Sequence, residues 1–166
     1  MKFTALISAA VIALTALAGC NHGGSKPVTG SAAKPANGGT ASIDPCSLIT
    51  TSEATAVLGT QAKDGAPHAY QSMKQCEWDA AEGPVAGSVA ILVYVGGQKA
   101  RWPSTLAAAK QSPKFSDVQG LGDAAFTTGF DLHILKGDDM YQIGVAGPKD
   151  PLDRATAVAK QALARA

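Results

Sequence analysis

The sequence predicts an α+β domain: an antiparallel sheet of about five strands, three helices packed mainly on one face, and one disulfide. Two observations carry the fold prediction. Three segments place apolar residues at helical spacing, and five others alternate apolar and polar residues or are rich in β-branched ones. In chain order the segments read helix, strand, strand, helix, three strands, helix, an order typical of an antiparallel sheet with helices on one side.

The first helix is expected to begin after Thr50. Thr50 and Glu53 have the spacing of a capping box, in which each side chain accepts a hydrogen bond from the other residue's backbone N–H. Gly59 stands where a helix commonly ends. A first strand should follow at residues 76–80, where Cys76 and two apolar residues alternate with acidic ones.

The middle of the domain predicts a central strand and a second helix. Residues 88–95 form the most apolar run of the mature chain and are β-branched at every second position, which favours a strand. Residues 106–110 are rich in alanine and predict the helix, with Pro103 as its expected first residue and Pro113 beyond its end. Trp102 should enter just ahead of this helix.

Three strands and a helix complete the domain. The strands are expected at residues 124–127, 132–136 and 140–145, and Lys136-Gly137-Asp138-Asp139 forms a hairpin turn between the last two. The final helix should open at Asp150, a capping acid followed by proline at the first helical position. Its apolar stripe consists of Leu152, Ala155, Val158, Ala159, Ala162 and Leu163.

The first twenty residues resemble the signal peptide of a bacterial lipoprotein. A positive start at Lys2 is followed by an apolar run, and Leu17-Ala18-Gly19 stands directly before Cys20. The run of about 15 residues is short of the roughly 20 that cross a bilayer, and no basic stop-transfer segment follows it. An ordinary secretory signal would not need a cysteine at the cleavage position. We therefore expect residues 1–19 to be removed and Cys20 to be lipidated, so that membrane lipid is the first partner.

Residues 20–42 are expected to be the lipidated cysteine and a disordered tether. Within residues 21–42, Val28 is the only large apolar residue, so the segment cannot bury enough surface to offset its chain entropy. A flexible chain of this length reaches about 25 Å. Residues 43–166 then form a single globular domain, whose 11 basic and 13 acidic side chains provide no basic stripe for nucleic acid.

Lipidation of Cys20 leaves Cys46 and Cys76 as the remaining cysteines. An exported protein enters an oxidising compartment, where a disulfide between them is expected. The closed loop of about 30 residues predicts roughly 3.5 to 4 kcal/mol of stabilisation in the chain-entropy model. Two free buried cysteines, or half of a metal site, are the alternatives. A metal site needs further ligands close by, and only His68 lies inside the loop.

Four motifs, taken in order and spacing, resemble the bacterial lipoprotein family catalogued as domain of unknown function 3558. The resemblance runs from about residue 43 to the C-terminus and implies a lipobox, a low-complexity tether and a paired-cysteine framework. It implies no reaction and no catalytic residue. The motifs are Asp44-Pro45-Cys46-Ser47-Leu48-Ile49-Thr50, Leu58-Gly59, Cys76-Glu77-Trp78 and Val118-Gln119-Gly120-Leu121-Gly122-Asp123-Ala124-Ala125-Phe126.

No catalytic residue, metal site or cofactor is expected. Gly120-Leu121-Gly122-Asp123-Ala124-Ala125 matches the letters of the dinucleotide fingerprint, but the residues after it cannot continue the long helix which that site requires. Asp131 and His133 share one face of a strand and are expected to be a solvated surface pair, too few for a metal ion. The adjacent Asp138 and Asp139 should point apart into water.

Trp102 and Phe130 are the aromatic residues at loop or boundary positions, and they would form a contact surface if exposed. The predicted function is a lipid-anchored binding or interaction module of the cell envelope, and not an enzyme. The alternative is a carrier that holds an apolar small molecule or lipid between sheet and helices. Asn21 follows Cys20 where inner-membrane lipoproteins of enteric-type bacteria commonly have aspartate. We expect the outer membrane in a two-membrane organism, and otherwise the outer face of the plasma membrane.

Overall fold

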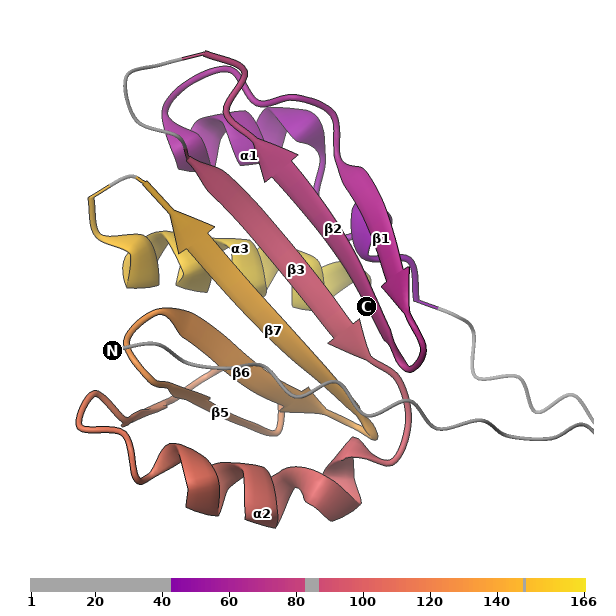
Figure 1. Cartoon of the computed structure of the whole chain (residues 1–166), viewed down its shortest axis with the longest axis vertical. Helices are drawn as coiled ribbons and strands as arrows, with labels where there is room; N and C mark the ends of the chain where they lie inside the picture. Colours follow the sequence, from indigo (N-terminus) through magenta and orange to yellow (C-terminus); the bar gives the residue numbers. More distant parts are fainter. Residues whose placement is uncertain (1–42, 83–86, 148) are drawn as a thin grey trace, which may run out of the picture. The chain divides into compact units, whose positions relative to one another are not determined.

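Seven antiparallel strands form one sheet in the order β1-β2-β3-β7-β6-β5-β4 (Figure 1). The structure is a computed structural model that describes residues 43–82, 87–147 and 149–166. The predicted signal peptide, Cys20 and the tether lie outside the described residues. The elements are the short 3-10 helix η1 (Pro45–Ser47), α1 (Thr51–Leu58), β1 (Ala66–Tyr70), β2 (Met73–Asp79), β3 (Ser88–Tyr94), α2 (Gln98–Ala109), β4 (Ser116–Val118), β5 (Ala124–Thr127), β6 (Asp131–Lys136), β7 (Asp139–Ala146) and α3 (Pro151–Arg165).

The predicted α+β class, the three α-helices and the antiparallel sheet are confirmed, but the sheet has seven strands rather than five. The two additional strands are the edges, β1 and β4. All five residues of β1 are exposed, so it carries no apolar alternation, and Pro67 within it is tolerated because an edge strand needs fewer ladder bonds. β4 has three residues and no buried one. Edge strands of this kind leave almost no apolar signal in the sequence.

One face of the sheet, called here the inner face, is covered by α1 and α3. Side chains alternate along each strand, and those pointing inward are sealed: Trp78 and Tyr141 are each 1% exposed and Ile91 is fully buried. The predicted stripe of α3 packs onto them, with Ala155, Val158, Ala159 and Ala162 fully buried. Burying one large apolar side chain contributes about 1.5–3 kcal/mol, so this face supplies most of the stability.

The other face, the outer face, has a smaller apolar cluster at one end. Trp102 of α2 packs against Phe126 with ring centroids 5.2 Å apart, and Leu135 completes the cluster. Phe126 and Leu135 alternate with inward residues of their strands, so α2 covers the outer face beside β5, β6 and β7. Only two of the three helices therefore share a face. In the part of the chain that the structure describes, no helix covers the outer face of β1 and β2.

α2 begins at Gln98, five residues before its expected first residue, Pro103, so Trp102 and Pro103 lie inside the helix. Its N-cap residue, Gly97, has no side chain to cap the helix. The β6–β7 turn supplies the acceptors instead: Asp138 accepts from the N–H of Gly97 at 2.7 Å. Asp139 accepts from the N–H of Gly96 at 2.8 Å. Asp138 is exposed as expected, but the expectation that the two carboxylates only point into water missed their role: they cap a helix about forty residues away in sequence.

The glycine-rich loop before β5 serves packing. A Cβ on Gly122 would lie 2.3 Å from the backbone oxygen of Leu135, so only glycine fits against β6 at this position. Between the two glycines, Leu121 is 3% exposed and joins the inner core. A strand follows rather than a helix, as expected for a sequence that matches the dinucleotide fingerprint by letters alone.

The predicted disulfide between Cys46 and Cys76 is confirmed, with Cα atoms 5.1 Å apart. It joins η1 to β2 and so fixes the start of the domain to the sheet. The capping box of α1 is also present, with both Thr50 and Glu53 bonded as predicted, and Gly59 ends the helix in a left-handed conformation. Asp150 stands before α3 but makes no capping bond, because its own backbone is left-handed (φ 55°).

Candidate functional site

Phe130 stands at the tip of the β5–β6 connection and is 69% exposed. Gly129 before it has a φ of 95°, and a Cβ there would lie 2.7 Å from the Lys114 side chain, so glycine leaves room for that stem. The Lys114 ammonium lies 4.6 Å from the centroid of the Phe130 ring. Trp102, the other aromatic residue expected at a contact surface, is 9% exposed and belongs to the α2 cluster. The two residues are therefore not brought together.

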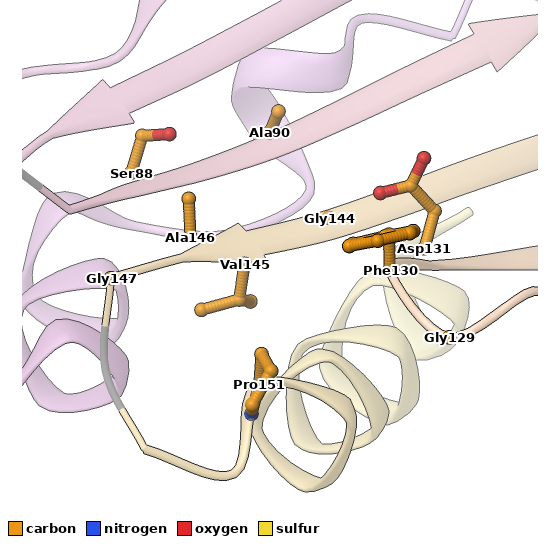
Figure 2. Close-up of a pocket in the computed structure, with 10 residues that line it drawn as sticks. All are labelled: Ser88, Ala90, Gly129, Phe130, Asp131, Gly144, Val145, Ala146, Gly147 and Pro151. Atoms are coloured by element: carbon orange, nitrogen blue, oxygen red, sulfur yellow. The ribbon is translucent and has the colours of Figure 1, made fainter.

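An open pocket of about 470 Å³ lies beside Phe130 and is called here the Phe130 pocket (Figure 2). Its floor exists because outward positions of two paired strands carry small side chains. Ser88 pairs with Ala146, and Ala90 pairs with Gly144 in the next row. Where larger residues would fill the sheet surface, these leave a hollow. The lining consists of Ser88, Ala90, Gly129, Phe130, Asp131, Gly144, Val145, Ala146, Gly147 and Pro151.

One carboxylate, that of Asp131, lines the pocket. Its Oδ2 accepts a hydrogen bond of 2.7 Å from Nε2 of Gln142. Its Oδ1 lies over Gly144, where a Cβ would approach it to 2.8 Å. The Tyr94 hydroxyl donates to Oε1 of Gln142 at 3.4 Å, which turns the amide nitrogen of Gln142 toward the carboxylate. The carboxylate is thus held in one orientation by a chain of contacts from β3 through β7 to β6.

The electrostatics follow from partial burial beside this carboxylate. Burial raises the pKa of Tyr94, and the negative charge of Asp131 raises it further, so the hydroxyl remains a donor. Burial lowers the pKa of His133, against an opposing effect of Asp131. His133 stacks on Phe126 with centroids 4.7 Å apart. Asp131 and His133 share the outer face as predicted, but His133 is packed against the α2 cluster rather than solvated.

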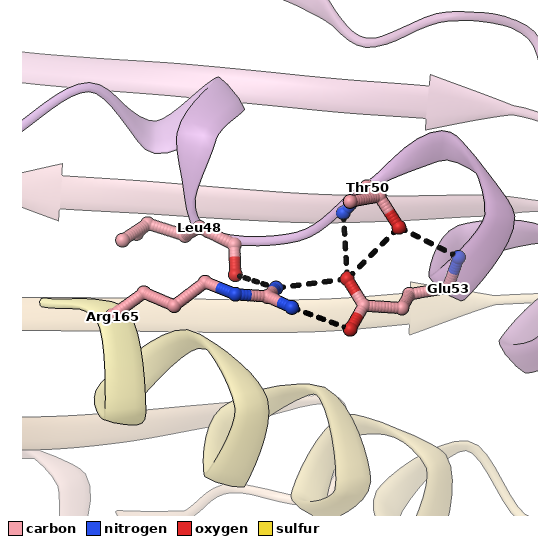
Figure 3. Close-up of polar contacts among 4 residues, drawn as sticks. All are labelled: Leu48, Thr50, Glu53 and Arg165. Atoms are coloured by element: carbon pink, nitrogen blue, oxygen red, sulfur yellow. Dashed lines mark hydrogen bonds and ion pairs between the residues drawn. The ribbon is translucent and has the colours of Figure 1, made fainter.

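A second group of polar contacts joins α3 to the capping box of α1 (Figure 3). Arg165 donates to both carboxylate oxygens of Glu53, at 2.8 and 2.7 Å, and to the backbone oxygen of Leu48. The Arg165 bond, followed by the backbone bond from Thr50, lowers the pKa of Glu53 to about 2. Both carboxylate oxygens of Glu53 accept hydrogen bonds from within the chain. These contacts therefore hold α1 and α3 together, and no ligand site is assigned to them.

The sequence identified Phe130 as a possible contact residue but not the rest of the pocket; Asp131 was expected only to be one member of a solvated surface pair with His133. Ala90, Gly144 and Ala146 become informative only when the strand register is known, because the hollow arises from small residues that are adjacent across strands. Their signal in the sequence is weak: small residues at alternate positions of otherwise apolar strands. No local motif distinguishes them from ordinary strand residues.

The chain matches no family model, no curated protein and no solved structure. Among the described helices, none is long and apolar enough to cross a membrane. The described residues also contain no group of three or more His, Cys, Asp or Glu side chains placed to hold a metal ion. The Phe130 pocket therefore combines an apolar hollow, the exposed ring of Phe130 and the oriented carboxylate of Asp131.

Proposed function

We propose that this protein is a lipid-anchored binding module of the cell envelope, with Cys20 as its anchor and the Phe130 pocket as its binding site. The observation that supports the binding role most directly is the 69% exposed ring of Phe130 beside an apolar hollow. A large exposed aromatic side chain at the rim of an apolar pocket is typical of a recognition site. The proposal assigns the protein no catalytic role.

The size and shape of the pocket favour one small apolar group. Its volume of about 470 Å³ lies within the range of roughly 300–1,000 Å³ found for small-molecule sites. It is open at the surface, so it suits a ring or short chain that projects from a larger partner. Such a partner would be another envelope protein, peptidoglycan or a lipid.

A carrier of an apolar molecule is the second candidate. The apolar lining of the Phe130 pocket favours it, but that pocket is open at the surface, where outward residues of β3 and β7 meet Val145 and Pro151. The space between the sheet and α3 is occupied by Tyr141, Ile143 and other side chains that are at most 1% exposed. A carrier would therefore hold its cargo in this surface pocket, and lipid should copurify with the protein and be detected by native mass spectrometry.

The anchor is tested by the Cys20→Ser substitution. The native chain should incorporate labelled palmitate and sediment with the envelope, in the outer membrane or on the outer face of the plasma membrane. The variant should lose both properties, because no other lipid attachment is proposed. Retention of the variant in the membrane fraction would contradict the anchor while leaving the pocket untouched.

The pocket is tested by filling it. Ala90→Leu places a larger side chain on the pocket floor, and it should weaken binding of the neutral fluorescent probe N-phenylnaphthylamine about tenfold, the effect of losing roughly 1.4 kcal/mol of contact. Phe130→Ala should weaken it similarly. Ala66→Leu is the matched control. Ala66 pairs with Glu77, and Glu77 pairs with Ala90, so Ala66 lies in the same cross-strand row of the outer face but outside the pocket. Unchanged probe binding in Ala90→Leu would refute the assignment.

A further inference from the structure

We infer that the ligand of the Phe130 pocket carries a positive charge beside its apolar group, an ammonium or guanidinium held against the Asp131 carboxylate and the Phe130 ring. The inference rests on the proposed binding role and specifies the chemistry of the ligand. Phe130 and Asp131 are consecutive, and both side chains line the pocket over β7 (Figure 2). An apolar hollow with an aromatic ring and a carboxylate is the composition that recognises organic cations.

The carboxylate has unused capacity on the side of the pocket. A carboxylate accepts up to about four hydrogen bonds, and Gln142 supplies one, to Oδ2. Oδ1 lies over Gly144, where the absence of a side chain leaves room for it, and both residues line the pocket. The hydrogen bond from Gln142 to Oδ2 is enough for Asp131 to join β6 to β7. Oδ1 is not needed for that contact.

The carboxylate is also held in place before any ligand arrives. Tyr94 orients Gln142, and Gln142 orients Asp131, so three strands fix the position of the negative charge. A charged group that is already oriented loses little freedom when it binds, which increases the affinity obtained from one ion pair. The half-buried position beside apolar side chains strengthens the attraction further, because less water screens it.

The Phe130 ring already interacts with a cation. Lys114 places its ammonium 4.6 Å from the ring centroid, within the range of about 6 Å for a cation–π contact, while its stem lies over Gly129. A ligand cation would displace this ammonium or take the other side of the ring. In both arrangements the two positive charges oppose each other, so Lys114 should weaken cation binding rather than assist it.

Other ligand charges fit the pocket poorly. A neutral apolar group would cover the Asp131 carboxylate without giving it a new partner, which costs free energy. An anion would meet the same carboxylate at close range and be repelled. A metal ion would find one carboxylate where it needs several ligands. A cation attached to an apolar group satisfies both the hollow and the charge.

Two probes of nearly the same shape test the inference on the mature chain with Cys20→Ser. Phenethylamine is cationic at neutral pH, and phenylethanol is neutral; their affinities are compared by NMR titration of the isotope-labelled protein. We expect the amine to bind about tenfold more tightly at low salt, because a charge-assisted contact is added to the same ring contact. The preference should shrink as salt is raised.

Three variants locate the origin of the preference. Asp131→Asn should remove most of the preference for the amine, leaving only the part that the Phe130 ring contributes. The affinity for phenylethanol should stay within about twofold, since asparagine keeps an oxygen for Gln142. Lys114→Gln should raise the affinity for the amine. Glu77→Gln is the matched control: Glu77 also accepts from a glutamine of its own face, Gln75, but lies outside the pocket.

The outcomes separate this inference from the function on which it rests. Equal affinity for the two probes, or a preference that is undiminished in Asp131→Asn, overturns the cationic ligand while the apolar pocket stands. Failure of both probes to bind the unsubstituted pocket overturns the proposed binding site as well.

Discussion

The two faces of the sheet are made by the same strands and yet have opposite properties. Along β3, residues with even numbers are partly exposed on the outer face, while Val89, Ile91 and Val93 are fully buried on the inner face. The inner face is closed by α1 and α3; the outer face is covered by α2 at one end and open at the Phe130 pocket. Under the proposed function, strand alternation would thus place stabilising residues on one face and binding residues on the other face of the same strands.

The polar connections follow the same division. Arg165 and the disulfide join elements that lie on the inner side, and Lys136 donates to the backbone oxygens of Leu163 and Ala166 at the end of α3. On the outer face, the contacts among Tyr94, Gln142 and Asp131 end at the pocket. Changes on the inner side should therefore lower the free energy of unfolding, and changes at the pocket should mainly alter binding.

The largest expected contrast is between two aromatic residues. Trp78→Ala should lower the free energy of unfolding by about 3–5 kcal/mol, because it leaves a cavity in the inner core. Phe130→Ala should change it by less than about 0.5 kcal/mol, since Phe130 is mostly in solvent. Urea denaturation of both variants measures the difference. Similar losses in the two would show that the faces do not divide stability from recognition.

The disulfide comes next in expected effect. Replacing both Cys46 and Cys76 with serine should cost about 3.5 kcal/mol, because the unfolded chain regains the freedom of a loop of about 30 residues. Urea denaturation with and without a reducing agent measures it. The reductant should have no effect on the double variant. Binding of the neutral probe to the folded fraction should be unchanged, since neither cysteine lines the pocket.

A smaller effect is expected for the cap that holds α2. Asp138→Ala removes the acceptor of the Gly97 N–H and should cost about 0.5–2 kcal/mol, as losing a helix cap does. Hydrogen exchange should quicken in α2 and remain slow in α3. Asp117→Ala, at an exposed position of β4, is the control and should leave both rates unchanged. Equal quickening in both helices would indicate that α2 is not a separate local unit.

The smallest effect concerns pH. The folded pKa of Glu53 is about 2, below its usual 4.5, so the stabilisation by its carboxylate is complete above pH 4.5 and is lost as pH falls toward 2. Glu53→Gln should flatten this part of the stability profile. At neutral pH, Glu53→Gln should lower the free energy of unfolding by less than Asp138→Ala does, because solvent screens exposed ion pairs. Denaturation midpoints from pH 2 to 6 measure it; identical acid slopes would contradict the assignment.

The sequence predicts the inner half of the domain well and the outer half poorly. Helix α3 and strand β3 carry strong apolar periodicity because one side of each is buried, and the cysteine count predicts the disulfide. The start of α2 is missed because its cap comes from Asp138, far along the chain. The edge strands are missed because they bury almost nothing.

The pocket is the part that the sequence shows least. Phe130 is identified as a candidate contact residue from its position in a loop, but Trp102, chosen by the same reasoning, lies inside α2 and packs against Phe126 and Leu135 of the sheet. Whether a boundary aromatic residue is buried depends on tertiary contacts that no local pattern encodes. The hollow itself depends on Ala90 and Gly144 being neighbours across two strands, which is a property of register alone.

The most direct test of the division between the faces is to map where phenethylamine binds, by amide chemical-shift changes across the isotope-labelled chain. The outer-face account predicts shifts concentrated at Ala90, Phe130, Asp131 and Gly144, and none in the buried stripe of α3. It also predicts that Ala90→Leu removes them. Shifts centred on α1 and α3, or no saturable shifts at all, would contradict the assignment of recognition to the outer face.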